Sequence, residues 1–315
     1  MRWWRASSTQ SQRPEPPVKA PQEFHYRLPA RFGGARPGAH RGASLGSGQA
    51  FADHRRLLDR PDPRRLDLRA SLRDPRGDWL VQVQTQRVAV PVHAIVDVSE
   101  SMRFGAARRK LDVAADFVEA LGHSAFRAGD ALGLLAFDED EREDLLRPAR
   151  HGRGLGGALA AALREAGPRP PRRAFLRTAR PGVVEALRRC VRRLAGRPGL
   201  VFLVSDFHWP LDGLAAVLDE LAPACVLPMI AWDPAEAEPP AEGALLSVRE
   251  SESGAPRSVW TGAAVREGWR AAVLARRAEL RTLFVARGLA PFELCGPTGA
   301  FDAEALTRHF LEAVA

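Results

Sequence analysis

The sequence predicts an α/β protein with a mostly parallel sheet that is covered by helices on both faces. From Val88 onward, short apolar runs alternate with segments whose apolar residues recur at helical spacing. This alternation is typical of parallel strands joined by helices. The chain has 315 residues, of which 45% are hydrophobic, so it can form one large domain with extensions or two small domains.

The strands and helices of this domain can be assigned in order. Four apolar runs are predicted to be buried strands, at residues 92–96, 132–137, 200–204 and 225–231. The segments between them are predicted to be helices, at residues 111–126, 158–165, 183–194 and 211–221. In the first helix, Leu111, Ala115 and Val118 recur at spacings of three and four residues, as the buried face of an amphipathic helix requires.

After the fourth strand the pattern changes to a hairpin and two more helices. Residues 245–249 and 257–260 alternate like strands and flank a turn, which predicts a small β-hairpin insertion. A long helix is predicted over residues 263–287, and a short apolar segment follows at 292–294. Asp302 has the character of an N-cap, so a last helix is predicted to begin there.

The residues before Val88 have a different composition. Residues 1–22 are rich in Pro, Ser and Gln, which predicts a disordered tail. Residues 23–87 are rich in Arg and Gly, with short apolar pieces such as the alternating residues 80–84. We expect this basic lead-in region to pack on the main domain, which spans residues 88–315.

Charge and cysteine content limit the environment of the protein. The formal net charge is +8, which does not by itself indicate nucleic acid as a partner. Cys190, Cys225 and Cys295 lie far apart in apolar segments, so we expect free thiols in a reducing compartment. The N-terminus lacks the apolar core of a signal peptide, and no run approaches the roughly 18 apolar residues that a membrane span needs. We therefore expect a cytoplasmic protein with no membrane span.

Oxygen-bearing side chains gather at the end of the first predicted strand. Residues 92–96 lead into Asp97, Ser99 and Ser101, and alternate residues of an extended segment point the same way. A carboxylate and two hydroxyls can therefore converge on one hard cation such as Mg²⁺. The open alternative is a polar turn between strand and helix, in which the same residue types serve turn and cap chemistry.

Two further oxygen donors belong to other loops. Asp206 follows the predicted strand 200–204, and in a parallel sheet it would lie beside Asp97 at the edge where α/β proteins bind ligands. Thr178 precedes the predicted helix 183–194 and offers a hydroxyl from a third loop. Mg²⁺ commonly takes one or two carboxylates and keeps several waters, which this set allows. Asp206 as a helix N-cap and Thr178 as an ordinary loop residue remain open alternatives.

Two other patterns match functional motifs without the required context. Residues 42–46 fit G-x-S-x-G, but no buried strand precedes them. Residues 152–157 contain G-x-G-x-x-G, but no clear strand precedes them and no acidic strand end follows. The scattered histidines and cysteines form no zinc pattern. We expect all of these to be structural residues.

The motif around Asp97 resembles a known domain. Asp97-x-Ser99-x-Ser101-Met102, followed by a helix and by residues 129–137, resembles the von Willebrand factor A domain. The resemblance implies a Rossmann-like fold with a metal-ion-dependent adhesion site. It also implies the ligands of that site, which would be Asp97, Ser99 and Ser101 from the first loop, Thr178 from the second and Asp206 from the third.

Segments outside the motif resemble one bacterial family more closely. Residues 46–51 and 62–71 ahead of the motif, and residues 248–254 behind it, resemble the DUF58 family. Members of that family are commonly encoded beside MoxR-type AAA+ ATPases. The resemblance covers residues 25–315 and implies that a MoxR-like ATPase is a partner of this protein.

The expected function follows from the ligand set. Neutral hydroxyls and at most two carboxylates would leave bound Mg²⁺ with residual positive charge and exchangeable waters, so an acidic residue of a partner protein could replace a water. Because no general base of suitable type stands beside the site, we expect a non-enzymatic adaptor protein that helps to assemble or activate other proteins. The alternatives are a Mg²⁺-dependent hydrolase that draws on the acidic residues 138–141, and a nucleic-acid-binding protein that uses the Arg-rich N-terminal region.

Overall fold

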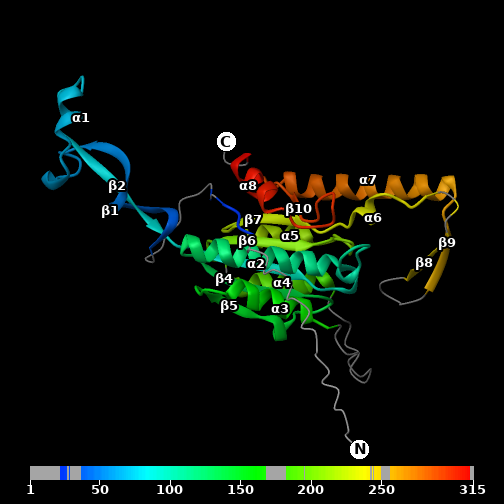
Figure 1. Cartoon of the computed structure of the whole chain (residues 1–315). Helices are drawn as coiled ribbons and strands as arrows, with labels where there is room; N and C mark the ends of the chain where they lie inside the picture. The colour runs from blue at the N-terminus through cyan, green and yellow to red at the C-terminus, as the bar shows by residue number, and fades with distance from the viewer. Residues whose placement is uncertain are drawn as a thin grey trace, which may run out of the picture.

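A computed structural model describes most of the chain (Figure 1). The described residues are 22–26, 28, 37–167, 182–194, 196–241, 243, 245–249 and 256–312. The predicted disordered tail, apart from residue 22, therefore lies outside them. Within the described residues, no helix is long and apolar enough to cross a membrane.

A six-stranded sheet forms the centre of the molecule, in the order β10-β7-β6-β3-β4-β5. All neighbouring strands are parallel except β4 and β5. The chain builds outward from β3 to the edge strand β5 and then returns to the other side of β3 with β6. The strands are β3 (Pro91–Asp97), β4 (Ala131–Phe137), β5 (Arg147–Arg150), β6 (Leu200–Ser205), β7 (Cys225–Ile230) and β10 (Phe292–Glu293).

Helices cover both faces of this sheet, as Figure 1 shows. One apolar cluster contains α2 (Lys110–Ala128), α3 (Leu155–Glu165) and α8 (Ala303–Glu312). The other contains α4 (Val183–Leu194), α5 (Leu214–Glu220) and the C-terminal half of α7 (Ala263–Val285). Strand β3 contributes side chains to both clusters.

The alternation of side chains along β3 explains how it serves both faces. Ala94 and Val96 belong to the first cluster, whereas Ile95 belongs to the second, as the two-residue period of a strand requires. All three are 0% exposed. A strand buried on both sides reads as a continuous apolar run, which is why the sequence predicts it clearly.

Two smaller sheets extend from this body. A long ribbon of β1 (Pro37–Arg56) and β2 (Leu80–Val88) carries η1 (Pro63–Arg65) and α1 (Leu68–Arg73) at its far end and projects from the body in Figure 1. The hairpin of β8 (Leu245–Arg249) and β9 (Pro256–Trp260) lies near the N-terminal end of α7. The remaining short elements are η2 (Glu100–Arg103), η3 (Glu143–Leu145) and α6 (Pro234–Ala237).

The N-terminal segment is fixed to the body by a buried polar cluster. The Asp130 carboxylate accepts the Tyr26 hydroxyl at 2.6 Å, lies 2.7 Å from His40 Nε2, and accepts the Val90 amide at 2.8 Å. The side chain of Phe24 lies beside this cluster in the first apolar core and is 1% exposed. The start of the lead-in region therefore contributes to the core, whereas the ribbon projects from it.

The α/β class with helices on both faces is confirmed, and so are the N-terminal extension and the hairpin. Sequence reasoning did not find β1, α1 or β5. Strand β5 reads Arg-Pro-Ala-Arg and lies at the sheet edge with mainly exposed side chains, so it lacks an apolar run. Strand β1 is rich in glycine and pairs only with β2.

Candidate metal site

The two predicted carboxylates meet at the carboxyl edge of the sheet. Asp97 is the last residue of β3, and Asp206 follows the last residue of its neighbour β6. Both side chains are 0% exposed. They lie where the strand order reverses, since β4 and β6 flank β3 on opposite sides. This is the position at which open α/β sheets bind ligands.

The two serines connect these carboxylates. The Ser99 amide donates to Asp97 Oδ1 at 2.9 Å, and the Ser99 and Ser101 hydroxyl oxygens lie 3.1 Å apart. Hydrogen bonding from the Ser99 side chain acts to lower the pKa of Asp97, and hydrogen bonding from the Ser101 side chain acts to lower the pKa of Asp206. Asp97, Ser99 and Ser101 thus form one hydrogen-bonded group, and Ser101 lies close enough to Asp206 to lower its pKa.

Neutral donors surround the Asp97 carboxylate. Its Oδ2 accepts the Ser205 hydroxyl at 2.6 Å and the Trp209 indole N–H at 3.0 Å. Burial and, after it, repulsion from Asp206 raise the pKa of Asp97 to about 6, while the bonds from Ser205 and Ser99 oppose the rise. The carboxylate is therefore oriented by its neighbours, but its charge lacks an equally close cation among the described residues.

Asp206 has a cationic partner that sequence reasoning missed. Lys110 Nζ donates to Asp206 Oδ2 at 2.8 Å and to Glu236 Oε1 at 2.7 Å, and its side chain is 1% exposed. Burial acts to raise the pKa of Asp206, but the charges of Lys110 and His208 and the hydrogen bonds from Lys110 and Ser101 together outweigh it, and the pKa lies below its usual value. Asp206 is therefore held ionised at neutral pH.

The loop after β6 holds a strained backbone. Phe207 has a φ of 52°, which is uncommon for a residue other than glycine. Arg276 on α7 donates to the carbonyl of Phe207 at 2.6 Å, and the Trp232 indole donates to the carbonyl of Asp206 at 2.7 Å. These bonds hold the loop in the conformation that turns Asp206 toward Ser101.

The geometry fits a divalent cation of the Mg²⁺ type. Neighbouring ligands in an octahedral shell at about 2.1 Å from the ion lie about 3 Å apart, and the two serine oxygens already have this separation. Two carboxylates, those of Asp206 and Glu236, share one buried ammonium group, and the Asp97 carboxylate accepts only from neutral donors. The group is therefore rich in oxygen and negative charge, as a hard cation prefers.

Comparison with known proteins identifies the family of the chain. The family model described as "Protein of unknown function DUF58" matches residues 61–279. The chain belongs to the DUF58 family. No curated protein matches it.

Two solved structures are similar to this DUF58 protein. One is an aerotolerance-related membrane protein from Bacteroides fragilis NCTC 9343 with multiple mutations to serines, with 14% identity, coverage of 72% of this chain and 98% of the other, and a TM-score of 0.42. The other is the conserved hypothetical protein BatB from Bacteroides thetaiotaomicron, with 16% identity, coverage of 71% and 98%, and a TM-score of 0.43. The DUF58 chain has an α/β fold whose central sheet is parallel except for one antiparallel edge strand.

The fifth predicted residue, Thr178, lies outside the described residues. The acidic segment after β4 forms ion pairs with arginines: Asp138 pairs with Arg142, and Asp140 pairs with Arg189. Among the described residues, no three His, Cys, Asp or Glu side chains come together in a way that could hold a metal ion, so the candidate site rests on two carboxylates and two hydroxyls. In the described part of the DUF58 chain, the candidate site is therefore the group around Asp97 and Asp206.

The two glycine patterns have no functional context in the DUF58 fold. Residues 42–46 lie within β1, on the projecting ribbon. Residues 152–157 do lead into α3, but the strand before them is the antiparallel edge strand β5. A dinucleotide-binding loop requires a parallel strand inside the sheet, so this segment serves as a connection.

Proposed function

We propose that this DUF58 protein is a non-enzymatic, metal-dependent binding protein that docks a carboxylate of a partner protein. Asp97, Ser99, Ser101 and Asp206 would hold Mg²⁺ or another divalent cation, with Thr178 as a further ligand. The partner would belong to a complex that a MoxR-like AAA+ ATPase helps to assemble or activate, as the family resemblance suggests.

One observation carries the proposal. The two carboxylates are fully buried, whereas Ser99 and Ser101 are only partly buried. The hydroxyls therefore form the outer side of the group, and a partner reaches them first. A bound cation would supply the positive charge that attracts the partner's carboxylate, while the neutral hydroxyls add no negative charge to repel it.

The orientation of the inner carboxylates supports binding rather than hydrolysis. Both oxygens of Asp97 accept hydrogen bonds, from Ser99 on one side and from Ser205 and Trp209 on the other. Neither oxygen is poised to take a proton from an attacking water. Among the acidic residues that a hydrolase would draw on, Asp138, Asp140 and Glu141 are engaged by arginines.

Two measurements on purified protein test this proposal. Calorimetric titration with MgCl₂ is expected to detect one ion per chain, and a purified MoxR-type ATPase from the same cells is expected to be retained in Mg²⁺ but not in EDTA. Replacing Ser99 and Ser101 together by Ala is expected to abolish both signals. Asp212→Ala is the matched control, because Asp212 is an exposed carboxylate in the loop after the same strand. Unchanged binding in the double variant or in EDTA would contradict the proposal.

A further inference from the structure

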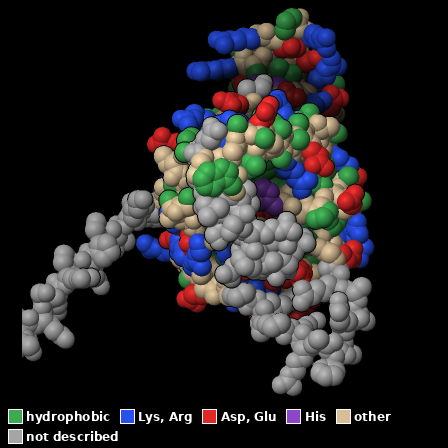
Figure 2. Space-filling model, turned by 90° about the vertical axis from the view of Figure 1, so that its right-hand side faces the viewer, with side chains coloured by type: hydrophobic (Ala, Val, Ile, Leu, Met, Phe, Trp, Pro, Cys, Tyr) green, Lys and Arg blue, Asp and Glu red, His purple; other side chains and the backbone are tan. Residues whose placement is uncertain are grey.

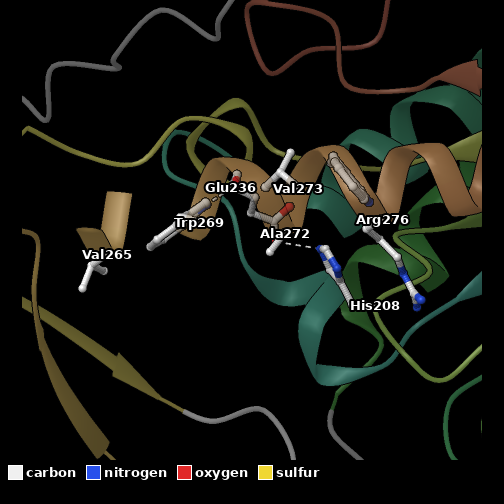
Figure 3. Close-up of a pocket in the computed structure, with 8 residues that line it drawn as sticks. His208, Glu236, Val265, Trp269, Ala272, Val273 and Arg276 are labelled. Carbon is white, nitrogen blue, oxygen red and sulfur yellow. Dashed lines mark hydrogen bonds and ion pairs between the residues drawn. The ribbon is translucent and has the colours of Figure 1, made fainter. Parts of the chain in front are cut away.

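A groove lies directly beside the candidate metal site. It has a volume of about 650 Å³ and runs between α7 and the loops that follow β6 and β7 (Figure 3). Its lining is mainly apolar and aromatic: Trp232, Val265, Trp269, Ala272 and Val273 line it together with His208, Glu236 and Arg276. Figure 2 views this end of the molecule and shows hydrophobic side chains at the surface among charged ones.

The groove and the metal site share residues. His208 in the groove wall is two residues beyond Asp206, and its backbone amide donates to Asp206 Oδ1 at 3.1 Å. Lys110 bridges Asp206 to Glu236, which is also in the wall. The groove wall and the candidate metal site are therefore joined through His208 and Lys110.

The polar groups of the groove are already engaged. Glu236 accepts Lys110 and the Asp233 amide, its backbone carbonyl accepts the Trp269 indole at 2.7 Å, and His208 Nε2 lies 3.5 Å from its carboxylate. The guanidinium of Arg276 is turned to the carbonyls of the β6 loop. What the groove still offers to a ligand is apolar and aromatic surface.

Aromatic stacking keeps this surface in place. The His208 ring stacks on Trp232 at 5.4 Å and 17°, and the Arg277 guanidinium lies over the same indole at 5.2 Å. The Trp269 indole is fixed by its bond to Glu236. Preformed pockets with rigid aromatic walls are the usual receptors for one large apolar anchor side chain.

We infer that the groove binds a large apolar side chain of the same partner segment whose carboxylate docks at the metal site. The inference rests on the proposed function and names the recognised sequence: an acidic residue with an aromatic or large aliphatic residue a few positions away. The carboxylate would supply the metal dependence, and the apolar anchor would supply specificity. The two contacts are continuous through His208 and Lys110.

Fluorescence polarisation with synthetic nonapeptides tests this inference. Each peptide has a central Asp, and Trp or Leu is placed at one of the flanking positions in an otherwise Gly/Ser background. In Mg²⁺, one offset is expected to bind at least about tenfold more tightly than the peptide with Asp alone. Ala272→Trp fills the groove and should remove this gain, whereas Ala271→Trp, at the preceding exposed position of α7 and outside the groove lining, should keep it.

The outcomes separate this inference from the proposed function. Mg²⁺-dependent binding of the Asp peptides with no benefit from any apolar residue overturns the inference and leaves the proposed function standing. Apolar peptides that bind equally well without Asp or in EDTA overturn the coupling of groove and metal. An equal loss in Ala271→Trp and Ala272→Trp also counts against the groove. Circular dichroism of both variants checks that they fold.

Discussion

Lys110 is a buried cation that competes with the proposed ion, and replacing it by Met has two opposite consequences. Its ammonium group bridges Asp206 and Glu236 and is 1% exposed. Removing one partner of a buried ion pair costs about 3–5 kcal/mol. Because Glu236 keeps 19% of its side chain exposed, we expect the lower end, about 3 kcal/mol. In EDTA, Lys110→Met should therefore unfold at a lower temperature than the native protein.

The same substitution should strengthen metal binding. Two unit charges at 4 Å interact by about 4 kcal/mol at an effective dielectric constant of about 20. If only a third of this repulsion between Lys110 and the ion is relieved, the affinity for Mg²⁺ rises about tenfold. At a Mg²⁺ concentration about 100 times the dissociation constant of the native site, ion binding stabilises the native protein by about 2.7 kcal/mol. At the same concentration, Mg²⁺ should stabilise the variant by about 1.4 kcal/mol more.

Thermal unfolding in EDTA and in graded MgCl₂ measures both effects, and calorimetry gives the affinity. Arg109→Met is the matched control, since Arg109 is the preceding residue and pairs with Asp112 at the surface. Its loss should change stability by less than about 1 kcal/mol and leave Mg²⁺ affinity unchanged. A Lys110→Met protein that is as stable as the native one in EDTA, or that gains less from Mg²⁺, would refute this reasoning.

Two further predictions concern the core. Gly122→Ala should lower the free energy of unfolding in denaturant by about 1–3 kcal/mol, because a Cβ there would lie 2.2 Å from the Gly156 Cα. Gly157→Ala is the control: the space around Gly157 is open, so this change should cost less than about 1 kcal/mol. Burial and the charge of Arg197 lower the pKa of His93 to about 4, so the unfolded chain binds a proton at this residue more tightly than the folded one. The free energy of unfolding should therefore be highest above about pH 6.5 and should fall by up to about 3 kcal/mol as the pH falls toward 4. His93→Gln should flatten that profile, and an unchanged profile would exclude His93 as its source.

The fold is predictable from sequence wherever burial is complete. Strands β3, β4 and β6 are apolar along nearly their whole length, and a strand buried on both faces has no other composition available. Burial fails as a signal at the edge strand β5 and in the long strand β1. Their hydrogen bonds come from pairing with a neighbour, which local sequence does not record.

The candidate site shows the same division. Asp97 and Asp206 are readable from sequence because each directly follows an apolar strand. Lys110 was missed because it looks like an ordinary first-turn helix residue. A signal for it exists: Lys110 lies four and seven residues before Ala114 and Phe117, on the buried face of α2. A lysine on such a face needs a buried anionic partner.

Glu236 was missed for a different reason. Asp233 and Glu236 form a capping box at the start of α6, and the pattern Asp-Pro-Ala-Glu is visible after the fourth strand of the parallel set. The capping role accounts for one oxygen of Glu236, through the Asp233 amide. Only the fold brings the other oxygen to Lys110, because 126 residues separate the two.

The arrangement of charges gives the proposed site a specific property. Lys110 neutralises part of the charge on Asp206 from inside the core, so the carboxylates are held together by the protein itself. Asp97 is oriented by neutral donors, and Arg276 fixes the strained loop at Phe207 through the backbone. We therefore expect the fold to form without an ion, in contrast to structural metal sites whose binding energy is folding energy. An ion at the proposed site would then bind and leave with the partner, as reversible docking requires.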